Sequence, residues 1–382
     1  MTPVNHRILM DARPLLDERG GGVFEYSRRL ADNLEGLPGI RLEKWANRFA
    51  PAPVDVGQGF DAMTRWPNKI LHAGARFVSR PRFDRLSGIE ADIFWAPNPH
   101  FISLSDGMPF VLTMHDLSFE RYPEFFSPKQ RLWHKAVDPK ALCRRARKIL
   151  AVSAHTKRDI VDLYGIDPDR IVVTHEGCDE RYRREPSPES IEEVRTRLAL
   201  PKHFILHVGT LEPRKNHLGL LAAFDLLKKD AKFSDLHLVM AGPPGWSNAG
   251  IRRAIASSPN RDRIRTLGFI GESDKPALYR LAHAFVFPSF YEGFGLPPLE
   301  AMASGTPTIA SFAASLGEIV GDAGLLVDPY RPAEIADAIA SVLESPSLRA
   351  ELSARGRERA KRFTWEACAE ETAEAFREVL GR

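Results

Sequence analysis

Short apolar runs alternate with longer amphipathic segments along the whole chain. The runs are rich in β-branched and aromatic residues, as in Phe110–Met114, and each ends near a polar residue or a glycine. The segments between them have helical length and carry apolar residues on one face. This alternation is typical of parallel sheets built from βαβ units, so the pattern predicts an α/β fold.

The predicted strands fall into two series. The strands of the first half are Arg7–Met10, Ile93–Ala96, Phe110–Met114, Ile149–Val152 and Ile171–Thr174. The strands of the second half are Phe204–Val208, Leu236–Ala241, Ile264–Leu267, Ala284–Phe287, Thr308–Ala310 and Leu325–Val327. Two separate sheets fit this count better than one sheet.

A polar stretch with two prolines, residues 183–190, separates the two series and resembles an interdomain linker. The 382 residues suit two domains of roughly 150 to 200 residues each, with a cleft between them. We therefore predict domains at residues 1–183 and 184–364. A last helix begins near Thr364 and carries Trp365, Ala369, Phe376 and Val379 on one face.

Composition narrows the class of protein. With 43% hydrophobic and 27% charged residues the chain resembles soluble globular proteins, and a net charge of +3 does not favour a dedicated nucleic-acid binder. Three cysteines at long spacings suggest a reducing compartment. No apolar run approaches the ~18 residues of a membrane span, and no signal peptide is visible. We expect a cytoplasmic protein, peripheral at the inner face of the membrane at most.

Two basic stretches bear on whether the protein contacts the membrane surface. Residues 121–148 contain nine basic and two acidic side chains, and basic residues between Arg65 and Arg85 are interleaved with Trp66, Phe77 and Phe83. This pattern is compatible with contact to an anionic membrane. Ordinary solvated helix faces would give it as well.

The strongest chemical signal is the segment Ser289–Met302, directly after a predicted strand. Two glycines bracket a turn into a predicted helix at Leu296–Ser304, whose first turn tolerates two prolines. A glycine-lined turn at a helix N-terminus offers free N–H groups and the positive end of the helix dipole to a phosphate. We expect Phe294, Gly295 and Leu296 at this phosphate.

Glu292 and Glu300 flank the turn. Their eight-residue separation would span ~12 Å if it were all helical, comparable with the distance from sugar to ribose across a diphosphate. One carboxylate would accept hydrogen bonds from sugar hydroxyls and the other from ribose hydroxyls. The alternative is that Glu292 is an ordinary loop acid and Glu300 an exposed helix acid.

A second loop, Gly209–Asn216, places Arg214 and Lys215 together before a predicted helix. The positive end of the helix dipole disfavours cations at a helix start, so a negatively charged ligand is needed to explain why Arg214 and Lys215 lie there together. A diphosphate leaving group is such a ligand, because Arg and Lys stabilise the negative charge that develops as the glycosidic bond breaks. Gly209 and Thr210 begin this loop. The alternative is a solvated basic pair.

Two signals lie in the first half. Gly20, Gly21 and Gly22 stand between the first predicted strand and a helix, where glycine lets the backbone approach a ligand, although a flexible loop fits equally. His115 and Asp116 follow another strand, and the histidine could bond a sugar hydroxyl or an acceptor. A structural histidine is the alternative.

We predict no metal and no other cofactor. Asp167-Pro168-Asp169 matches the DxD pair that holds a divalent ion in many sugar-nucleotide enzymes, but it precedes a strand instead of following one. Arg214 and Lys215 already provide positive charge. No His/Cys cluster has zinc spacing.

With these residues in place, nearly the whole chain resembles glycosyltransferase family 4, whose retaining enzymes have the GT-B architecture of two Rossmann-like domains. Glu292 and Glu300 match the E-x7-E pattern of that family. Gly209–Asn216 matches its phosphate-binding loop, Gly20–Gly22 its acceptor-domain glycine loop, and His115-Asp116 its cleft motif.

The resemblance implies an N-terminal acceptor domain, a C-terminal donor domain and a last helix, residues 365–382, that returns to the first. It implies that Glu292 positions the sugar without attacking it, and that backbone near Phe269 and Ile270 meets the nucleobase. The segment Leu211–Asn216 looks most like bacterial mannosyltransferases of lipopolysaccharide and exopolysaccharide assembly. GDP-mannose and a saccharide or lipid-linked acceptor are therefore expected.

Three rival functions need a discriminating feature. A Rossmann oxidoreductase would need G-x-G-x-x-G after the first strand, and Gly20–Gly22 lacks that spacing. A sugar-nucleotide epimerase or hydrolase would release nucleotide without an acceptor. A non-catalytic binding protein would have lost site residues, and all of them are present.

Overall fold

The computed structural model describes residues 6–16, 21–49 and 59–381. The chain forms two compact units. The N-terminal unit comprises Met1–Leu117, Pro128–Gly177 and Trp365–Arg382, and the C-terminal unit comprises Ser118–Ser127 and Cys178–Thr364.

The N-terminal unit is built on a sheet in which every pairing is parallel, in the order β3-β2-β1-β4-β5-β6-β7. Its strands are β1 (His6–Asp11), β2 (Ile40–Asn47), β3 (Ala62–Thr64), β4 (Ile93–Ala96), β5 (Phe110–Met114), β6 (Lys148–Ala151) and β7 (Ile171–Val173). The central strands are buried on both faces, as their continuous apolar runs predict.

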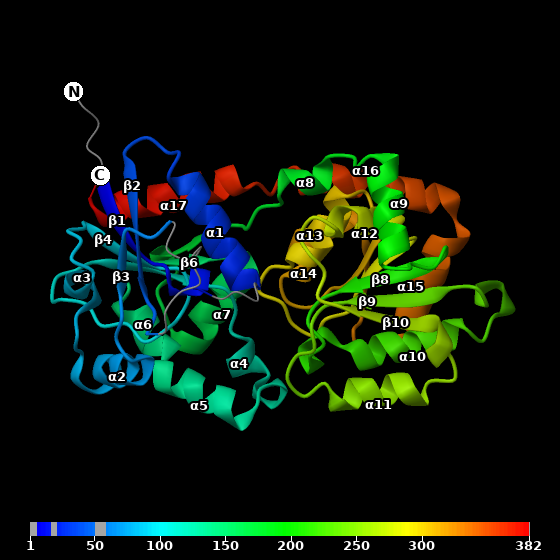
Figure 1. Cartoon of the computed structure of the whole chain (residues 1–382), viewed down its shortest axis with the longest axis horizontal. Coiled ribbons are helices and arrows are strands. Elements are labelled where there is room, and N and C mark those ends of the chain that lie inside the picture. Colours follow the sequence, from blue (N-terminus) through cyan, green and yellow to red (C-terminus); the bar gives the residue numbers. More distant parts are fainter. Residues whose placement is uncertain (1–5, 17–20, 50–58, 382) are drawn as a thin grey trace. The chain divides into compact units, whose positions relative to one another are not determined.

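Helices cover both faces of this sheet (Figure 1). One face holds α1 (Gly22–Leu34) and α17 (Trp365–Val379), which pack on each other; Phe376 of α17 meets Trp95 of β4 with ring centroids 6.0 Å apart. The other face is covered by α2 (Asn68–Ala73), α3 (Phe83–Leu86), α5 (Pro128–Val137), α6 (Pro139–Arg145) and α7 (Ala154–Tyr164). The apolar side chains of these helices bury the alternate residues of the strands.

The C-terminal unit has a second parallel sheet, in the order β10-β9-β8-β11-β12-β13. Its strands are β8 (Phe204–Val208), β9 (His237–Ala241), β10 (Ile264–Gly268), β11 (Ala284–Phe287), β12 (Thr308–Ser311) and β13 (Leu325–Val327). The chain runs outward from β8 to β10 and then returns to β11 on the other side of β8. Both units are therefore doubly wound.

The helices of this unit also form two layers (Figure 1). One contains α9 (Pro188–Arg197), α12 (Lys275–Leu281), α13 (Leu296–Ala303) and α16 (Pro346–Ala360); the other contains α10 (His217–Leu227), α11 (Ala249–Ser257) and α15 (Pro332–Glu344). Shorter helices are α4 (Ser118–Arg121), α8 (Glu180–Arg183) and α14 (Leu316–Val320).

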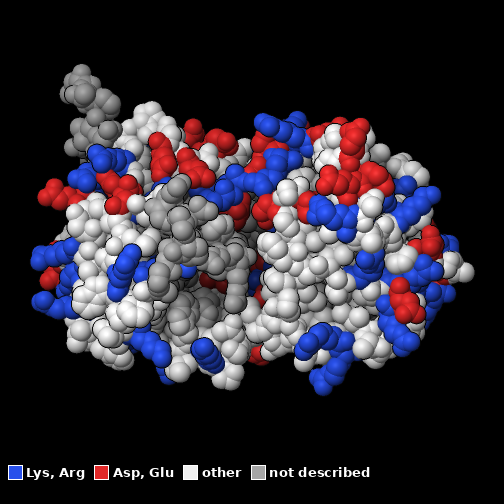
Figure 2. Space-filling view, viewed as in Figure 1, with Lys and Arg blue, Asp and Glu red and all other residues white. Residues whose placement is uncertain are grey.

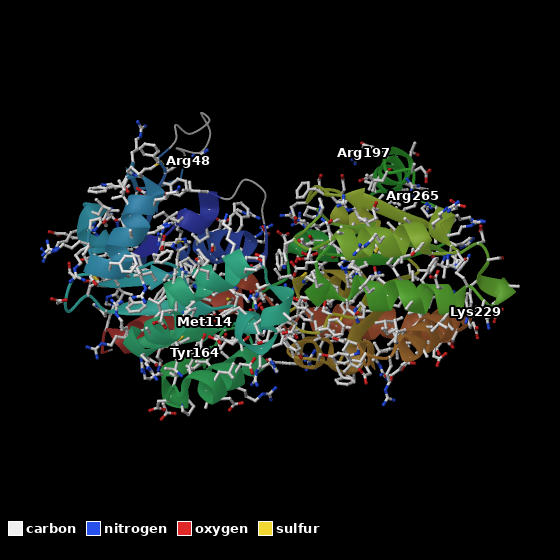
Figure 3. All side chains as sticks on the ribbon, turned by 90° about the horizontal axis from the view of Figure 1, so that it is seen from below. Arg48, Met114, Tyr164, Arg197, Lys229 and Arg265 are labelled. Atoms are coloured by element: carbon white, nitrogen blue, oxygen red, sulfur yellow. The ribbon has the colours of Figure 1, made fainter. Side chains whose placement is uncertain are left out.

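Two arginines that are labelled in Figure 3 hold α9 in place. Arg197 pairs with Asp274, 2.7 Å away, just before α12. Arg265 of β10 donates to the carbonyl oxygen of Leu198 at 3.3 Å. The end of α9 is thereby tied both to the next helix and to the edge of the sheet.

Every predicted strand is present to within two residues at each end, so the α/β fold with two sheets is confirmed. Two strands, β2 and β3, were not predicted. The apolar pattern of β2 is broken by Arg41, Glu43 and Lys44, and Glu43 is buried against Arg7 and Arg41 at 3.4 and 2.7 Å. Ion pairs near the sheet edge replace the apolar contacts that the pattern requires.

The predicted linker was misplaced. The chain passes between the units after Gly177, not after Arg183, and the predicted linker residues include the end of α8 and the start of α9. Ser187 caps α9 by accepting a hydrogen bond from the Ser190 N–H, and Pro188 occupies the first turn, where it needs no N–H partner. Ser-Pro here begins a helix and does not interrupt one.

A further difference concerns Ser118–Ser127. This segment lies in sequence within the predicted first domain, but in space it belongs to the C-terminal unit. Apolar periodicity predicts local elements and cannot show such an exchange.

Candidate active site

The carboxyl ends of β8 and β11 adjoin at the point where the strand order of the C-terminal sheet reverses. The two strands pair directly, with Ala284 opposite Ile205 and Phe285 opposite Leu206. Ligands of open α/β sheets bind beyond the strand ends at such a switch point. The loop after β8 carries Arg214 and Lys215, and the loop after β11 carries Glu292.

These three side chains form one ion-paired cluster. The Glu292 carboxylate accepts from Arg214 Nη1 at 2.8 Å and from Lys215 Nζ at 2.7 Å, one cation on each oxygen. Arg214 Nη2 also lies 2.9 Å from Oε1 of Glu212. The structure therefore brings these three predicted residues together and pairs the two cations with the carboxylate, a contact that the sequence did not show.

The charges of this cluster are set by burial and by its own members. Burial alone would raise the pKa of Glu292, but Arg214 and Lys215 hold the pKa of this carboxyl below its ordinary value. Burial raises the pKa of Glu212, and the same two cations only partly oppose it. The same two cations therefore lower the pKa of Glu292 but do not offset the effect of burial on the pKa of Glu212.

Backbone bonds fix the two loops against each other. Phe290 N donates to the Arg214 carbonyl at 2.9 Å, and Arg214 Nη1 donates to the Tyr291 carbonyl at 2.8 Å. The Ser315 hydroxyl donates to the carbonyls of Glu292 and Phe294 at 2.9 and 2.7 Å. The position of Glu292 is therefore defined by its backbone as well as by its ion pairs.

Arg214 and Lys215 lie in a 3₁₀ turn, Pro213–Lys215, and not in the first turn of α10. Asn216 follows with φ 57° and caps α10 by accepting from Gly219 N at 3.1 Å. Its amide also donates to the carbonyls of Pro288 and Pro329 at 3.1 and 2.7 Å. Asn216 thus links the two functional loops, and a sequence motif alone does not reveal that link.

The glycine-lined turn has the predicted form. Gly295 stands before α13 with φ +119°, and a Cβ there would lie 2.8 Å from Leu316. Leu296 begins α13, and Phe294 is buried. On the neighbouring loop, a Cβ on Gly242 would lie only 2.0 Å from the Gly209 carbonyl, so glycine is needed there for the loops after β8 and β9 to meet. Thr210 continues the loop after β8.

Glu300 lies inside α13 and is buried, so the exposed helix acid that we considered is wrong. Its Oε2 accepts from the Tyr279 hydroxyl at 2.7 Å. Burial raises the pKa of Glu300, nearby Glu272 adds to the rise, and Lys275 and two tyrosines partly oppose it.

Two histidines, His207 and His217, lie near the Lys215 ammonium. This ammonium lies 4.9 Å from the Phe287 ring centroid, and His207 stacks on that ring and meets His217 at 4.6 Å. Burial lowers the pKa of His207 to about 4, and it also places the pKa of His217 well below its ordinary value. Both imidazoles are neutral near pH 7 and do not repel the ammonium.

In the N-terminal unit, His115 follows β5 with both ring nitrogens engaged. Nε2 lies 2.9 Å from the Pro97 carbonyl oxygen, and Nδ1 lies 3.3 Å from Glu176 Oε1. Asp116 follows it directly. Gly21 and Gly22 are exposed at the start of α1, whereas Gly20 lies outside the described residues.

Comparison with known proteins now bears on these residues. Residues 20–182 match the model of "Glycosyltransferase Family 4", and residues 190–359 match that of "Glycosyl transferases group 1". O-antigen chain mannosyltransferase B of Escherichia coli is 36% identical over 288 residues, which are 75% of this chain and 74% of that protein. The chain belongs to glycosyltransferase family 4.

A second E. coli relative, serotype-specific mannosyltransferase WbdA, is 30% identical over 284 residues, 72% of this chain. The match spans about a third, 34%, of the length of WbdA. Among solved structures, Anabaena HepE in complex with UDP and glucose has a TM-score of 0.75 at 20% identity, covering 98% of this chain and 100% of that one. This glycosyltransferase therefore has the GT-B fold of two Rossmann-like domains.

In this family 4 glycosyltransferase, Phe269 and Ile270 directly follow β10. Phe269 is 65% exposed and Ile270 is buried. Gly268 before them has φ +71°, which turns the chain away from the strand.

The described residues hold no group of three or more His, Cys, Asp and Glu side chains that could bind a metal ion. Asp167 caps a 3₁₀ turn by accepting from the Asp169 N–H. The three cysteines are buried, and none of them forms a disulfide. Within the same residues, no helix has the length and apolar character that crossing a bilayer requires.

Residues that sequence reasoning missed serve mainly to hold the predicted ones. They are Glu212, Asn216, Tyr279 and Ser315. Glu212 and Asn216 lie in the loop that was recognised, so their proximity was available as a signal. Tyr279 and Ser315 are far from Glu300 and Glu292 in sequence, and no local pattern indicates them.

Proposed function

We propose that this glycosyltransferase moves mannose from GDP-mannose to a saccharide or lipid-linked saccharide during cell-surface polysaccharide synthesis, with retention of anomeric configuration. The observation that carries the proposal is the cluster of Arg214, Lys215 and Glu292 at the adjoining ends of β8 and β11. A diphosphate is the ligand that two cations beside a glycine-lined helix start suit best.

In this proposal Arg214 and Lys215 stabilise the leaving nucleoside diphosphate. Each cation already faces one oxygen of Glu292, so both are oriented before substrate arrives. Groups that are fixed in advance spend little energy on reorganisation as charge develops on the leaving oxygen. The turn at Phe294, Gly295 and Leu296 adds backbone N–H groups, and Gly209 and Thr210 line the neighbouring loop.

Glu292 positions the sugar and its two cations and does not attack the anomeric carbon. Both carboxylate oxygens face cations at 2.7 and 2.8 Å, and this weakens the carboxylate as a nucleophile. Its lowered pKa also makes it a poor general acid. Departure of the diphosphate with attack from the same face is the retaining mechanism that fits such a residue.

Glu300 is proposed to accept hydrogen bonds from ribose hydroxyls. Tyr279 engages Oε2, and this contact fixes the direction of the carboxyl group. Phe269 and Ile270 are proposed to meet the nucleobase.

His115 and Asp116 are proposed as catalytic residues beside the sugar or the incoming acceptor, and Gly21 and Gly22, in the glycine loop of the acceptor domain, are proposed to bind the donor. The Glu176 and Pro97 contacts hold the His115 ring in one orientation. A polar ring fixed in this way can align a hydroxyl or the sugar without itself moving.

The choice of mannose and of polysaccharide synthesis rests on the relatives. O-antigen chain mannosyltransferase B and WbdA are both named for mannosyl transfer. HepE, which shares the fold at 20% identity, was solved with UDP and glucose, so the binding experiment compares guanosine with uridine donors. Transfer without a metal ion is proposed because Arg214 and Lys215 can neutralise the diphosphate.

Isothermal titration of the purified protein with GDP, GDP-mannose, UDP and UDP-glucose, without added metal, tests the donor. We expect GDP and GDP-mannose to bind and the uridine compounds to bind far more weakly. Tighter binding of UDP-glucose would overturn the assignment of the donor while leaving glycosyl transfer intact.

An assay of nucleotide release by the same purified protein, with and without acceptor, distinguishes the rival functions. Acceptor-dependent release of nucleotide is the outcome for a transferase. Release that needs no acceptor indicates a hydrolase or an epimerase, and donor binding without any turnover indicates a binding protein.

A cytoplasmic location at the inner face of the membrane remains part of the proposal. A lipid-linked acceptor would be presented at such a surface. Contact with an anionic membrane is supported by the basic and aromatic residues of the N-terminal unit.

A further inference from the structure

The Ser118–Ser127 segment, which belongs to the C-terminal unit, packs aromatic rings on the loop after β11. Within the segment Tyr122 stacks on Phe125, with ring centroids 5.3 Å apart at 10°. Phe125 in turn stacks on Phe290 at 5.6 Å and 23°. Tyr122 meets Tyr291 edge-on at 5.8 Å. Two rings of the segment therefore pack on two consecutive residues of this loop.

The two loop residues link the functional loops of the candidate active site. Phe290 N donates to the Arg214 carbonyl at 2.9 Å, and Arg214 Nη1 donates to the Tyr291 carbonyl at 2.8 Å. The next residue is Glu292, whose carboxylate accepts from Arg214 and Lys215. A displacement of the two loop residues would therefore move Arg214 through two hydrogen bonds and Glu292 through the adjoining peptide bond.

The backbone of the segment is itself fixed on the C-terminal unit. Trp246, in the loop after β9, donates from Nε1 to the Phe125 carbonyl, and its ring stacks on Phe126 at 5.9 Å and 25°. Phe126 N donates to the Pro123 carbonyl at 3.1 Å and closes a 3₁₀ turn. These contacts set the direction in which the Phe125 ring points.

The four rings are packed and are not an ordinary solvated surface. Tyr291 is buried, and Tyr122, Phe125 and Phe290 are half-buried. By contrast, charged side chains of both signs are spread over the visible surface of the C-terminal unit (Figure 2). Loss of one packed ring would leave space beside the loop after β11, and the loop could shift into that space.

We infer that Tyr122 and Phe125 are positioning residues that fix Glu292 and its two cations for the chemical step. They act through the backbone of the loop after β11 and need not touch the donor. Charged groups stabilise a leaving group only while they keep their geometry, and a shift of about 1 Å can cost roughly 10²-fold in rate. The inference rests on the proposed function, in which this cluster meets the leaving diphosphate.

Kinetics of the full-length Phe125→Ala variant test the inference. We expect kcat for transfer to fall about tenfold, while the Kd of the donor changes less than about threefold, because the ring affects the geometry of the cluster more than the contacts to the nucleoside. Tyr122→Ala should show the same split. Phe125→Tyr keeps the ring and should restore kcat to within about twofold. Phe125→Leu keeps apolar volume without the ring and replaces Phe125→Ala if that variant does not fold.

Hydrogen exchange reports on the same loop without requiring activity. The Phe290 N–H, which is bonded to the Arg214 carbonyl, should exchange at least about tenfold faster in Phe125→Ala, because the loop opens more often once the ring is lost. Phe126→Ala is the matched control, since it removes a ring of equal size that stacks on Trp246. The control should leave both kcat and the exchange of Phe290 within about twofold of the unaltered protein.

Two results would overturn the inference. One is a loss in Phe126→Ala equal to that in Phe125→Ala, and the other is unchanged exchange of the Phe290 N–H in Phe125→Ala. If the unaltered protein transfers no sugar, the proposed function fails instead, and the exchange rates alone then decide whether Phe125 positions the loop.

Discussion

Two carboxylates of the C-terminal unit, Glu292 and Glu300, are both buried but differ in their surroundings. Glu292, in the turn after β11, faces Arg214 and Lys215, and its pKa is lowered. Glu300, inside α13, faces Tyr279, and its pKa is raised, with burial as the largest cause. Burial acts on both in the same direction, so the neighbours decide the outcome.

The opposite pKa shifts of Glu292 and Glu300 suit the two carboxylates to different roles. In the proposed mechanism Glu292 stays charged and keeps two cations in place where a diphosphate would leave, which assigns it to the chemical step. Glu300 is held by a hydroxyl in a site that disfavours charge, and this suits the binding of neutral hydroxyl groups. The proposal therefore assigns turnover to Glu292 and donor binding to Glu300, although the two residues are only eight positions apart.

The largest expected effect is on turnover. Glu292→Ala should lower kcat roughly 10²- to 10³-fold, because Arg214 and Lys215 lose the group that orients them. Donor affinity should change less than about tenfold. Steady-state kinetics and calorimetry give both values, with Glu344→Gln, an exposed acid in the same unit, as control. Unaltered transfer would remove Glu292 from the chemical step.

The next largest effect is on the free energy of unfolding, which should fall by different amounts when Glu292 and Glu300 are each replaced by Gln. Glu292→Gln removes the charged partner that buried Lys215 and half-buried Arg214 share, although Arg214 keeps Glu212, and it should lower the free energy of unfolding by about 3 kcal/mol. Glu300→Gln keeps an acceptor for Tyr279 and should cost less than about 1 kcal/mol. Urea denaturation of the two variants measures this difference. Equal losses would show that the two surroundings do not differ in energy.

Substitution of Glu300 should affect donor affinity more than turnover, which is the reverse of the effect expected for Glu292. Glu300→Ala should weaken binding of GDP-mannose about tenfold or more, since the ribose hydroxyls lose an acceptor, and kcat at saturation should change much less. Glu300→Gln, which still has an acceptor oxygen, is the matched control and should lose less affinity. If Glu300→Ala binds the donor normally, the ribose role is wrong.

The pH dependence of stability should show opposite signs. Glu292, whose folded pKa lies below 4.5, contributes stability that is present above that pH and is lost as the pH falls through the folded pKa. Glu300, whose folded pKa lies above 4.5, contributes stability that is present below that pH and is lost as the pH rises through the folded pKa.

Unfolding free energies of the two Gln variants relative to the unaltered protein, measured across this range, test these signs. The deficit of Glu292→Gln should shrink in acid. The free energy of unfolding of Glu300→Gln, relative to that of the unaltered protein, should increase as the pH rises. Parallel curves for both would mean that neither carboxyl has a shifted pKa.

The strand pattern predicted the fold because central strands of parallel sheets are buried on both faces. Phe110–Met114 and Phe204–Val208 are found with the predicted ends. β2 was missed because Arg41, Glu43 and Lys44 interrupt its apolar pattern, and their ion pairs with one another, Arg7 and Glu35 become visible only in the structure. The transfer of Ser118–Ser127 to the C-terminal unit likewise depends on contacts that no local pattern encodes.

The candidate site was predicted where chemistry is concentrated in short motifs. Arg214, Lys215 and Glu292 follow strand ends, and such positions in an α/β chain are natural candidates for binding. Their mutual pairing could not be predicted, because it needs β8 and β11 to be neighbours while β9 and β10 lie between them in sequence. Tyr279 meets Glu300 only through the packing of α12 on α13.

The central claim is glycosyl transfer from a nucleoside diphosphate sugar with retained configuration. Its most direct test is incubation with GDP-mannose with and without a mannose-terminated acceptor, followed by assay of free GDP and NMR of the anomeric centre of the product. We predict GDP release that requires the acceptor and a product with the anomeric configuration of the donor. Release without acceptor, or an inverted anomeric centre, would contradict the account.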